Sequence, residues 1–208
     1  MKIIHQDSDI VVVEKESGML SVPGRGPEKI DSVVHRIRQL IPECISHPAA
    51  HRLDMDTSGL MVLGITAEAH RHLSIQFQDR TVEKSYVALL EGILAKDEGT
   101  ITLPFRLDID NRPYQIYDEV HGKIGTTEWK KIGIEGNFTR IAFKPITGRT
   151  HQLRVHSAHP KGLGIPIVGD NLYGNGTGFG QLKLHAAELA FDHPSTGERL
   201  RFKTEPPF

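Results

Sequence analysis

A charged turn over residues 51–59 leads directly into a short apolar run, and this junction constrains the fold more than any other feature. The turn reads His-Arg-Leu-Asp-Met-Asp-Thr-Ser-Gly, and Leu-Met-Val-Leu follows it at 60–63. A short apolar run bounded by a polar turn is typical of a buried strand. A loop held by such a strand keeps a charged group in place, which makes the turn a candidate functional site.

Length and composition indicate one globular domain, or one domain with two lobes that share a core. The chain has 208 residues and a hydrophobic fraction of 38%, and no apolar run approaches the roughly 18 residues that span a bilayer. The first residues lack the apolar segment of a secretory signal. The single cysteine, Cys44, excludes an intrachain disulfide and favours a reducing compartment, so we expect a cytoplasmic protein.

Charge is balanced overall but uneven along the chain. The formal net charge is -1, yet residues 136–169 contain no Asp or Glu. The basic residues in that stretch are Arg140, Lys144, Arg149, Arg154 and Lys161. A one-sign segment indicates either a local footprint for phosphate groups or an ordinary solvated surface, and charge alone favours neither.

The hydrophobic pattern predicts more strands than helices. Helices are expected after a cap at Asp31, after a cap at Thr66, and over 151–158 with Thr150 as cap. The expected strands cover 10–15, 60–65, 84–91, 100–103, 126–133, 138–145, 184–191 and 199–203. Short links between strands favour an α+β fold with a mixed, largely antiparallel sheet flanked by helices and loops.

Asp54 is the first candidate for chemistry. An aspartate in a Thr-Ser-Gly turn commonly bonds its own backbone, and that reading stays open for Asp54 from the turn alone. Asp56 suits the turn role better because it directly precedes Thr57.

Two further segments supply partners. Tyr86 follows Lys84-Ser85 in an expected strand, and its ring is either a core side chain or a wall on which a base stacks. The segment 147–156 places Arg149 before a helix and Arg154 beside its apolar face. An arginine next to an apolar face is costly without a carboxylate partner, and Asp54 is the partner we expect.

These three segments, in this order, resemble the RluA family of RNA pseudouridine synthases. The resemblance extends to 9–25, 165–170 and 182–186, and so covers nearly the whole chain. It implies the pseudouridine synthase fold with a central active-site cleft, a single catalytic domain over 1–208 and no S4 domain. It also implies a reaction without cofactor or metal, a substrate in 23S rRNA, a tRNA anticodon stem-loop or both, and no obligate protein partner.

The resemblance also implies roles for single residues. Asp54 is the essential carboxylate, acting on C1′ as nucleophile or on C2′ as base, and Arg154 is its ion-pair partner. Tyr86 stacks on the uracil, and Leu184 forms the opposite wall. Arg52 fills the space that the extruded base leaves. Arg149, His151 and His156 are expected to contact RNA, although solvated groups are as compatible with their positions.

Two alternatives belong to other classes. A metal-dependent hydrolase is suggested by twelve histidines, but His151, His156 and His159 lack the four-residue spacing of a helical zinc site. A non-catalytic RNA-binding or folding module needs the basic segment and Tyr86 but not Asp54. Replacing Asp54 distinguishes that module from an enzyme.

Overall fold

The computed structural model describes all residues from 1 to 208, in two compact units. Unit 1 comprises residues 1–84 and 185–207, and unit 2 comprises residues 85–184 and 208. The chain passes between them within strands β4 (Glu83–Leu90) and β9 (Leu184–Asp192). The expected single catalytic domain and its central cleft stay predictions, and each unit is described by itself. No helix is long and apolar enough to cross a membrane.

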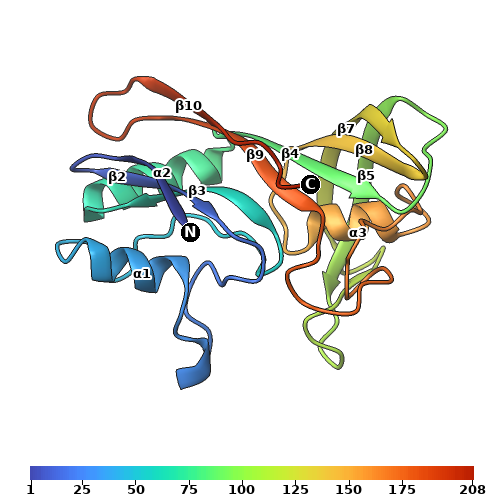
Figure 1. The fold of residues 1–208 in the computed structure, drawn as a ribbon, viewed down its shortest axis with the longest axis horizontal. Helices are drawn as coiled ribbons and strands as arrows, with labels where there is room; N and C mark the ends of the chain where they lie inside the picture. The colour runs from blue at the N-terminus through green and yellow to red at the C-terminus, as the bar shows by residue number, and fades with distance from the viewer. The chain divides into compact units, whose positions relative to one another are not determined.

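Unit 1 is a five-stranded sheet with a helix on either side (Figure 1). The strand order is β1 (Lys2–Gln6), β2 (Ile10–Lys15), β3 (Ser58–Gly64), β9 and β10 (Arg199–Lys203). All neighbours are antiparallel except β3 and β9, which run parallel. Because β2 and β3 are covered on both faces, they are almost continuously apolar.

The two long helices of unit 1 follow their capping residues. In α2 (Ala67–Asp79), Thr66 accepts a hydrogen bond from the Ala69 N–H, as expected. Helix α1 (Val33–Leu40) is capped by Ser32, which accepts from the His35 N–H. The predicted cap, Asp31, is therefore wrong: its carboxylate instead binds Arg36, because the serine one residue later reaches the first turn. A short 3-10 helix, η1 (Pro27–Lys29), precedes α1.

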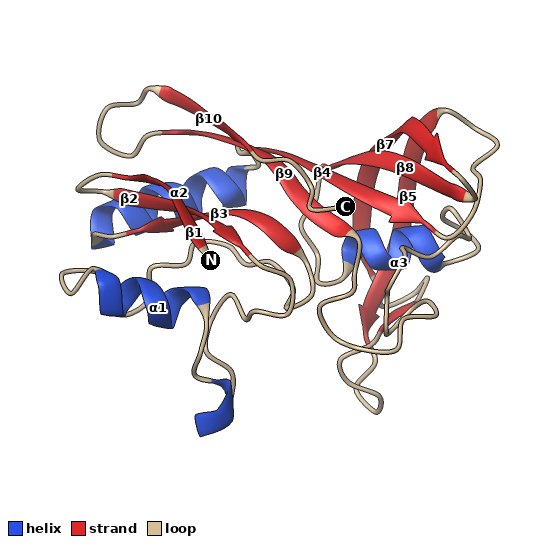
Figure 2. Ribbon diagram, in the orientation of Figure 1, coloured by secondary structure: helices blue, strands red, loops and turns tan.

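Unit 2 is a five-stranded antiparallel sheet with one helix packed against it (Figure 2). The strand order is β4, β8 (Phe138–Pro145), β7 (Lys123–Glu135), β5 (Glu98–Leu107) and β6 (Gln115–Tyr117). Helix α3 (Gln152–Ala158) contributes Leu153 and Val155 to the core. The expected α+β class and largely antiparallel pairing are confirmed, whereas β1 and β6 were not predicted.

One residue of α3 is buried without compensation. His156 has no exposed surface, and neither of its ring nitrogens has a hydrogen-bond partner. The expectation that His156 contacts RNA or solvent is therefore wrong, because its side chain faces the core. Its ring meets Phe105 edge to face, with centroids 5.7 Å apart. Burial lowers the pKa of His156 to about 4, so the folded protein holds this imidazole neutral.

We expect His156→Leu to stabilise the protein in acid. Between pH 6.5 and about 4, the unfolded chain binds a proton on this histidine and the folded chain does not. The free energy of unfolding therefore falls as the pH drops through this range. The variant has neither this proton-linked loss nor the two unpaired ring nitrogens. Its free energy of unfolding should exceed that of wild type by about 1 kcal/mol at pH 7 and by more at pH 5. Denaturant unfolding at both pH values measures it.

His72→Leu is the matched control, because His72 is exposed on α2. Equal pH dependence in wild type and His156→Leu would contradict the account of His156.

Candidate active site

The loop that carries Asp54 is fixed through its backbone. Asp54 is half-buried, and its carbonyl accepts from the Thr57 N–H at 3.1 Å. The Leu53 carbonyl accepts from Ser21 Oγ at 2.6 Å, and the Asp56 carbonyl accepts from Ser17 Oγ at 2.5 Å. Together with the Met55 carbonyl, whose donors are Lys15 and Gly18, every carbonyl from 53 to 56 has a donor. A loop bonded in this way can hold a charged side chain in one position.

The remaining carbonyl of this loop, at Met55, is bound by a buried lysine. Lys15 is 0% exposed, and its Nζ donates to the carbonyls of Met55 at 2.8 Å, Met19 at 2.8 Å and Glu16 at 2.9 Å. The Gly18 N–H also donates to Met55 at 2.9 Å. One ammonium thus joins the end of β2, the turn that follows it and the Asp54 loop.

The position of Lys15 sets its charge. Burial lowers the pKa of Lys15 to about 8, while the carboxylates of Asp56 and Asp54 act in the opposite direction. The ammonium is therefore mostly charged at neutral pH and is held by three carbonyls. Sequence reasoning treated Lys15 only as a strand end and missed it. The signal available was a lysine one residue after an apolar run, where a strand covered on both faces leaves little solvent.

The two residues before Leu53 are a half-buried histidine and an exposed arginine. His51 stacks on Phe77 with ring centroids 4.3 Å apart, and its Nε2 accepts from the Val62 N–H at 3.1 Å. Burial, and then Lys84, lower the pKa of His51 to about 3, so its ring is neutral. Arg52 is exposed, as a residue expected to reach RNA must be.

In unit 2, Arg154 is 2% exposed and binds a carboxylate in a bidentate pair. Its Nε donates to Asp170 Oδ2 at 2.9 Å and its Nη2 to Oδ1 at 2.6 Å. Burial raises the pKa of Asp170, but Arg154 and the N–H groups of Leu172 and Tyr173 lower it further, to below its ordinary value. The Tyr173 ring lies 5.4 Å from the guanidinium carbon.

This pair gives Arg154 a carboxylate partner other than the one expected from the sequence. A buried Arg154 does require a carboxylate, but the structure supplies Asp170, which sequence reasoning did not consider. The requirement therefore no longer points to Asp54, and an Asp54–Arg154 ion pair stays a prediction.

The start of α3 also differs from expectation. Thr150 is not the cap: His151 occupies that position in a left-handed conformation with φ 56°, and no side chain caps the helix. Instead, Gln152 Oε1 accepts from the Arg149 N–H at 3.1 Å, because its side chain folds back over the turn. His151 Nδ1 lies 2.8 Å from the Tyr173 hydroxyl.

The other predicted site residues of unit 2 are Tyr86, Leu184 and Arg149, and their roles stay predictions. Tyr86 packs against the core that Ala88 and Leu90 enter, so all three share a face of β4. Leu184 is 3% exposed and belongs to the same core. Arg149 is exposed.

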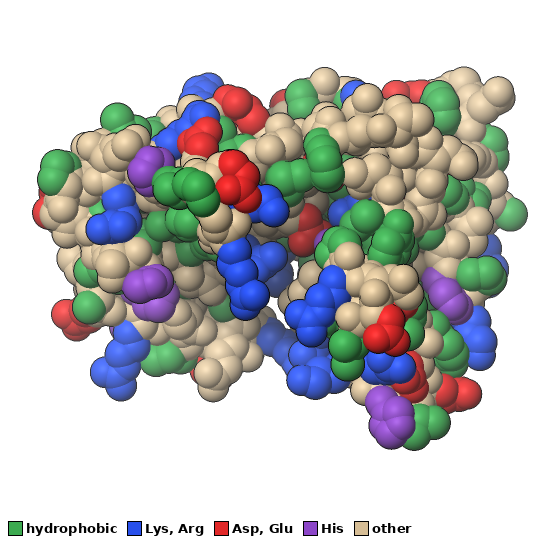
Figure 3. Space-filling view, turned by 90° about the horizontal axis from the view of Figure 1, so that it is seen from below, with side chains coloured by type: hydrophobic (Ala, Val, Ile, Leu, Met, Phe, Trp, Pro, Cys, Tyr) green, Lys and Arg blue, Asp and Glu red, His purple; other side chains and the backbone are tan.

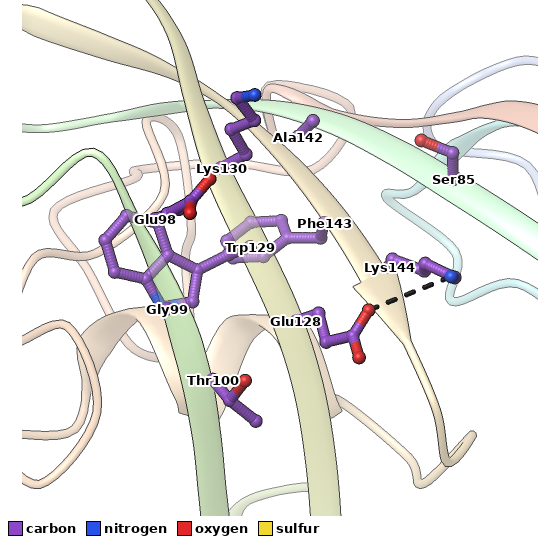
Figure 4. Close-up of a pocket in the computed structure, with 10 residues that line it drawn as sticks. All are labelled: Ser85, Glu98, Gly99, Thr100, Glu128, Trp129, Lys130, Ala142, Phe143 and Lys144. Atoms are coloured by element: carbon purple, nitrogen blue, oxygen red, sulfur yellow. Dashed lines mark ion pairs between the residues drawn. The ribbon is translucent and has the colours of Figure 1, made fainter.

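Unit 2 also has a cavity of about 420 Å³, whose lining residues are drawn in Figure 4. Glu98, Thr100 and Lys130 line it, the Trp129 ring lies against Gly99, and an ion pair of 3.8 Å joins Lys144 to Glu128. No predicted site residue lines it, so its volume does not mark the candidate site.

Asp7, Asp9 and His193 form the one group with metal-ligand spacing. His193 Nδ1 accepts from the N–H groups of Ser195 and Thr196, so its proton sits on Nε2, which faces Asp7 Oδ2 at 3.2 Å. This nitrogen donates to a carboxylate and does not offer a lone pair to a cation.

The buried Lys15 predicts an alkaline signature in stability. Between about pH 8 and its ordinary pKa of 10.5, the unfolded chain holds a proton that the folded chain has released, so folding gains free energy as pH rises. Lys15→Met abolishes this gain and leaves carbonyls unpaired, which lowers the free energy of unfolding by about 2–4 kcal/mol at pH 7. Denaturant unfolding from pH 7 to 10.5 tests both effects, with exposed Lys2→Met as control. Parallel curves for wild type and Lys15→Met would contradict the assignment.

Comparison with known proteins identifies the family. Residues 9–159 match the model of the RNA pseudouridylate synthase family. The chain is 43% identical to the dual-specificity RNA pseudouridine synthase RluA of Yersinia pestis, over 100% of both chains. It is 42% identical to the protein of that name from Escherichia coli K12, over 99% of this chain and 93% of the relative.

A solved structure agrees with these matches. Human RNA Pseudouridylate Synthase Domain Containing 1 superposes with a TM-score of 0.79 at 27% identity, over 100% of this chain and 84% of that one. The match over three quarters of the sequence, the full-length identities and the shared fold lead to one conclusion: the chain belongs to the RNA pseudouridylate synthase family.

Proposed function

We propose that this protein converts uridine to pseudouridine in structured RNA, in 23S rRNA, a tRNA anticodon stem-loop or both, with Asp54 as the essential carboxylate. As a family member it is an isomerase that acts on RNA. The observation that carries the assignment of Asp54 is its loop, whose four carbonyls from 53 to 56 all have donors. The relatives that cover the whole chain are named for dual specificity, which supports the two RNA classes.

The reaction is an isomerisation, so all atoms stay in the RNA except the exchanged proton. The C1′–N1 bond breaks, the uracil turns over, C5 joins C1′, and the hydrogen on C5 leaves while N1 gains one. Asp54 acts as the ionised carboxylate. Either it adds to C1′ as the C1′–N1 bond breaks and leaves as C5 joins C1′, or it removes the C2′ proton and returns it when C5 joins C1′. Both roles need a carboxylate held in one position, which the bonded loop provides.

The remaining residues act on the RNA. The target base must leave its stack at a cost of a few kcal/mol. Exposed Arg52 is suited to fill the vacated space, because its planar group stacks and also bonds phosphate. Tyr86 stacks on the uracil opposite Leu184, and Arg154, fixed by Asp170, completes the catalytic group. Arg149 and His151 contact the flanking RNA.

We expect the enzyme to be cytoplasmic and to act as a monomer. The single buried thiol at Cys44 suits a reducing compartment. Basic, acidic and hydrophobic side chains are interspersed on the face shown in Figure 3.

Asp54→Asn tests the catalytic role. Loss of the ionised group should lower turnover at least about 10³-fold while RNA binding stays within a few-fold of wild type. Release of the C5 hydrogen from labelled uridine in rRNA and tRNA transcripts measures turnover. Asp110→Asn, at an exposed position of unit 2, is the control. A non-catalytic RNA-binding module would keep its activity in Asp54→Asn, and that result would refute the proposal.

Arg52→Ala tests base extrusion. Because extrusion costs energy only where the base is stacked, the variant should lose about 10-fold more kcat/KM on a folded stem-loop than on an unpaired strand of the same sequence. Steady-state release of the C5 hydrogen from both substrates gives the two ratios. Equal losses on both would refute this role for Arg52.

A further inference from the structure

Unit 1 carries a half-buried lysine without an ion-pair partner. Lys84 lies on β4 with part of its side chain covered, and no carboxylate lies within 4.0 Å of its ammonium. The adjacent carboxylate, Glu83, is already engaged by Arg199 at 2.8 Å and Arg201 at 2.9 Å. Neighbouring residues of a strand point to opposite faces, so Glu83 leaves the Lys84 side uncompensated.

A second cation, Arg80, lies near Lys84. Burial, and then Arg80, lower the pKa of Lys84. Arg80 is exposed just after α2, and neither it nor Asp79, the last residue of that helix, forms an ion pair. Binding of an external anion lowers the electrostatic free energy of such a site.

An aromatic ring connects this cation to the Asp54 loop. The Lys84 ammonium lies 5.9 Å from the centroid of Phe77, and His51 stacks on the same ring at 4.3 Å. His51 directly precedes Arg52, two residues before Asp54. The uncompensated charge thus lies beside the loop that carries the proposed carboxylate.

We propose that Lys84 and Arg80 form a phosphate-binding site for the RNA backbone beside the Asp54 loop. The proposal rests on the proposed function, because it takes the anion to be RNA phosphate. The Lys84 ammonium supplies a point charge with three donors, and it lies over the Phe77 ring. Phosphate contacts of this kind fix the register of an RNA without reading its sequence. Lys84 is therefore a binding residue that sets where the strand lies relative to Asp54.

The test is the salt dependence of RNA binding by Lys84→Met. Each phosphate contact contributes about 0.7–0.9 to the slope of log K against log salt concentration. The variant should lose about that much of the slope and bind a tRNA anticodon stem-loop transcript about 5-fold more weakly at 0.1 M salt. Because its removal relieves an uncompensated cation, the variant should melt at or above the temperature of wild type.

Three further variants make the result decisive. Lys84→Arg should keep the slope, and Arg80→Gln, at an exposed position that does not threaten folding, should lower it. Lys130→Met, an exposed lysine in unit 2, should leave it unchanged. A wild-type slope in both Lys84→Met and Arg80→Gln would overturn the site, as would an equal loss in Lys130→Met.

The same measurements separate this site from the proposed function. If Lys84→Met and Arg80→Gln lower the salt slope but wild-type protein releases no C5 hydrogen, the function is refuted and the site is supported. Wild-type protein that turns over, with slopes that Lys84→Met and Arg80→Gln do not change, refutes the site alone.

Discussion

The bonds from Lys15 to three backbone carbonyls are the interaction on which the Asp54 loop depends. The register of β2 against β3 places Lys15 opposite Gly59, at the point where the loop enters the sheet. A carbonyl oxygen there cannot reach water, so it needs an internal donor. Gly59 is required at the same point: it has φ 112°, and a Cβ would lie 2.3 Å from the Ala186 carbonyl of β9. The backbone of the loop is thus held at Met55 and at Gly59, independently of the Asp54 side chain.

Each unit keeps one buried cation, and the two are stabilised differently. Lys15 is a compact charge that three carbonyl dipoles surround, whereas Arg154 is a planar group that a single carboxylate matches at two points. Burial is costly for both, so each is retained only because its donors are occupied. In unit 1 the ammonium holds the backbone of a carboxylate-bearing loop. In unit 2 the guanidinium is itself the proposed functional group, and Asp170 holds it.

Local sequence patterns predicted what local physics decides. Alternation and apolar runs located β3, β4 and β10, and Thr66 was found as a cap because its bond spans only three residues. The bond from Lys15 to Met55 spans 40 residues, and the pair Arg154–Asp170 spans 16, so no periodicity reveals either. Asp54 was singled out by its resemblance to a family motif and not by periodicity, and its catalytic role stays a prediction. Its neighbours Ser17 and Ser21 were not found, because a serine that bonds a distant carbonyl resembles any turn serine.

A protein of net charge -1 can still bind RNA if its acids are occupied internally. Many of the carboxylates form ion pairs, among them Asp31 with Arg36, Asp97 with Lys131, and Glu83 with two arginines. These ion pairs neutralise the carboxylates locally, and they leave the cations of the proposed RNA-binding residues unpaired. Arg52, Arg149, Arg80 and Lys84 form no ion pair with any carboxylate of the chain. The field that an RNA strand meets is set by these unpaired cations, and net charge averages them with acids that are already neutralised.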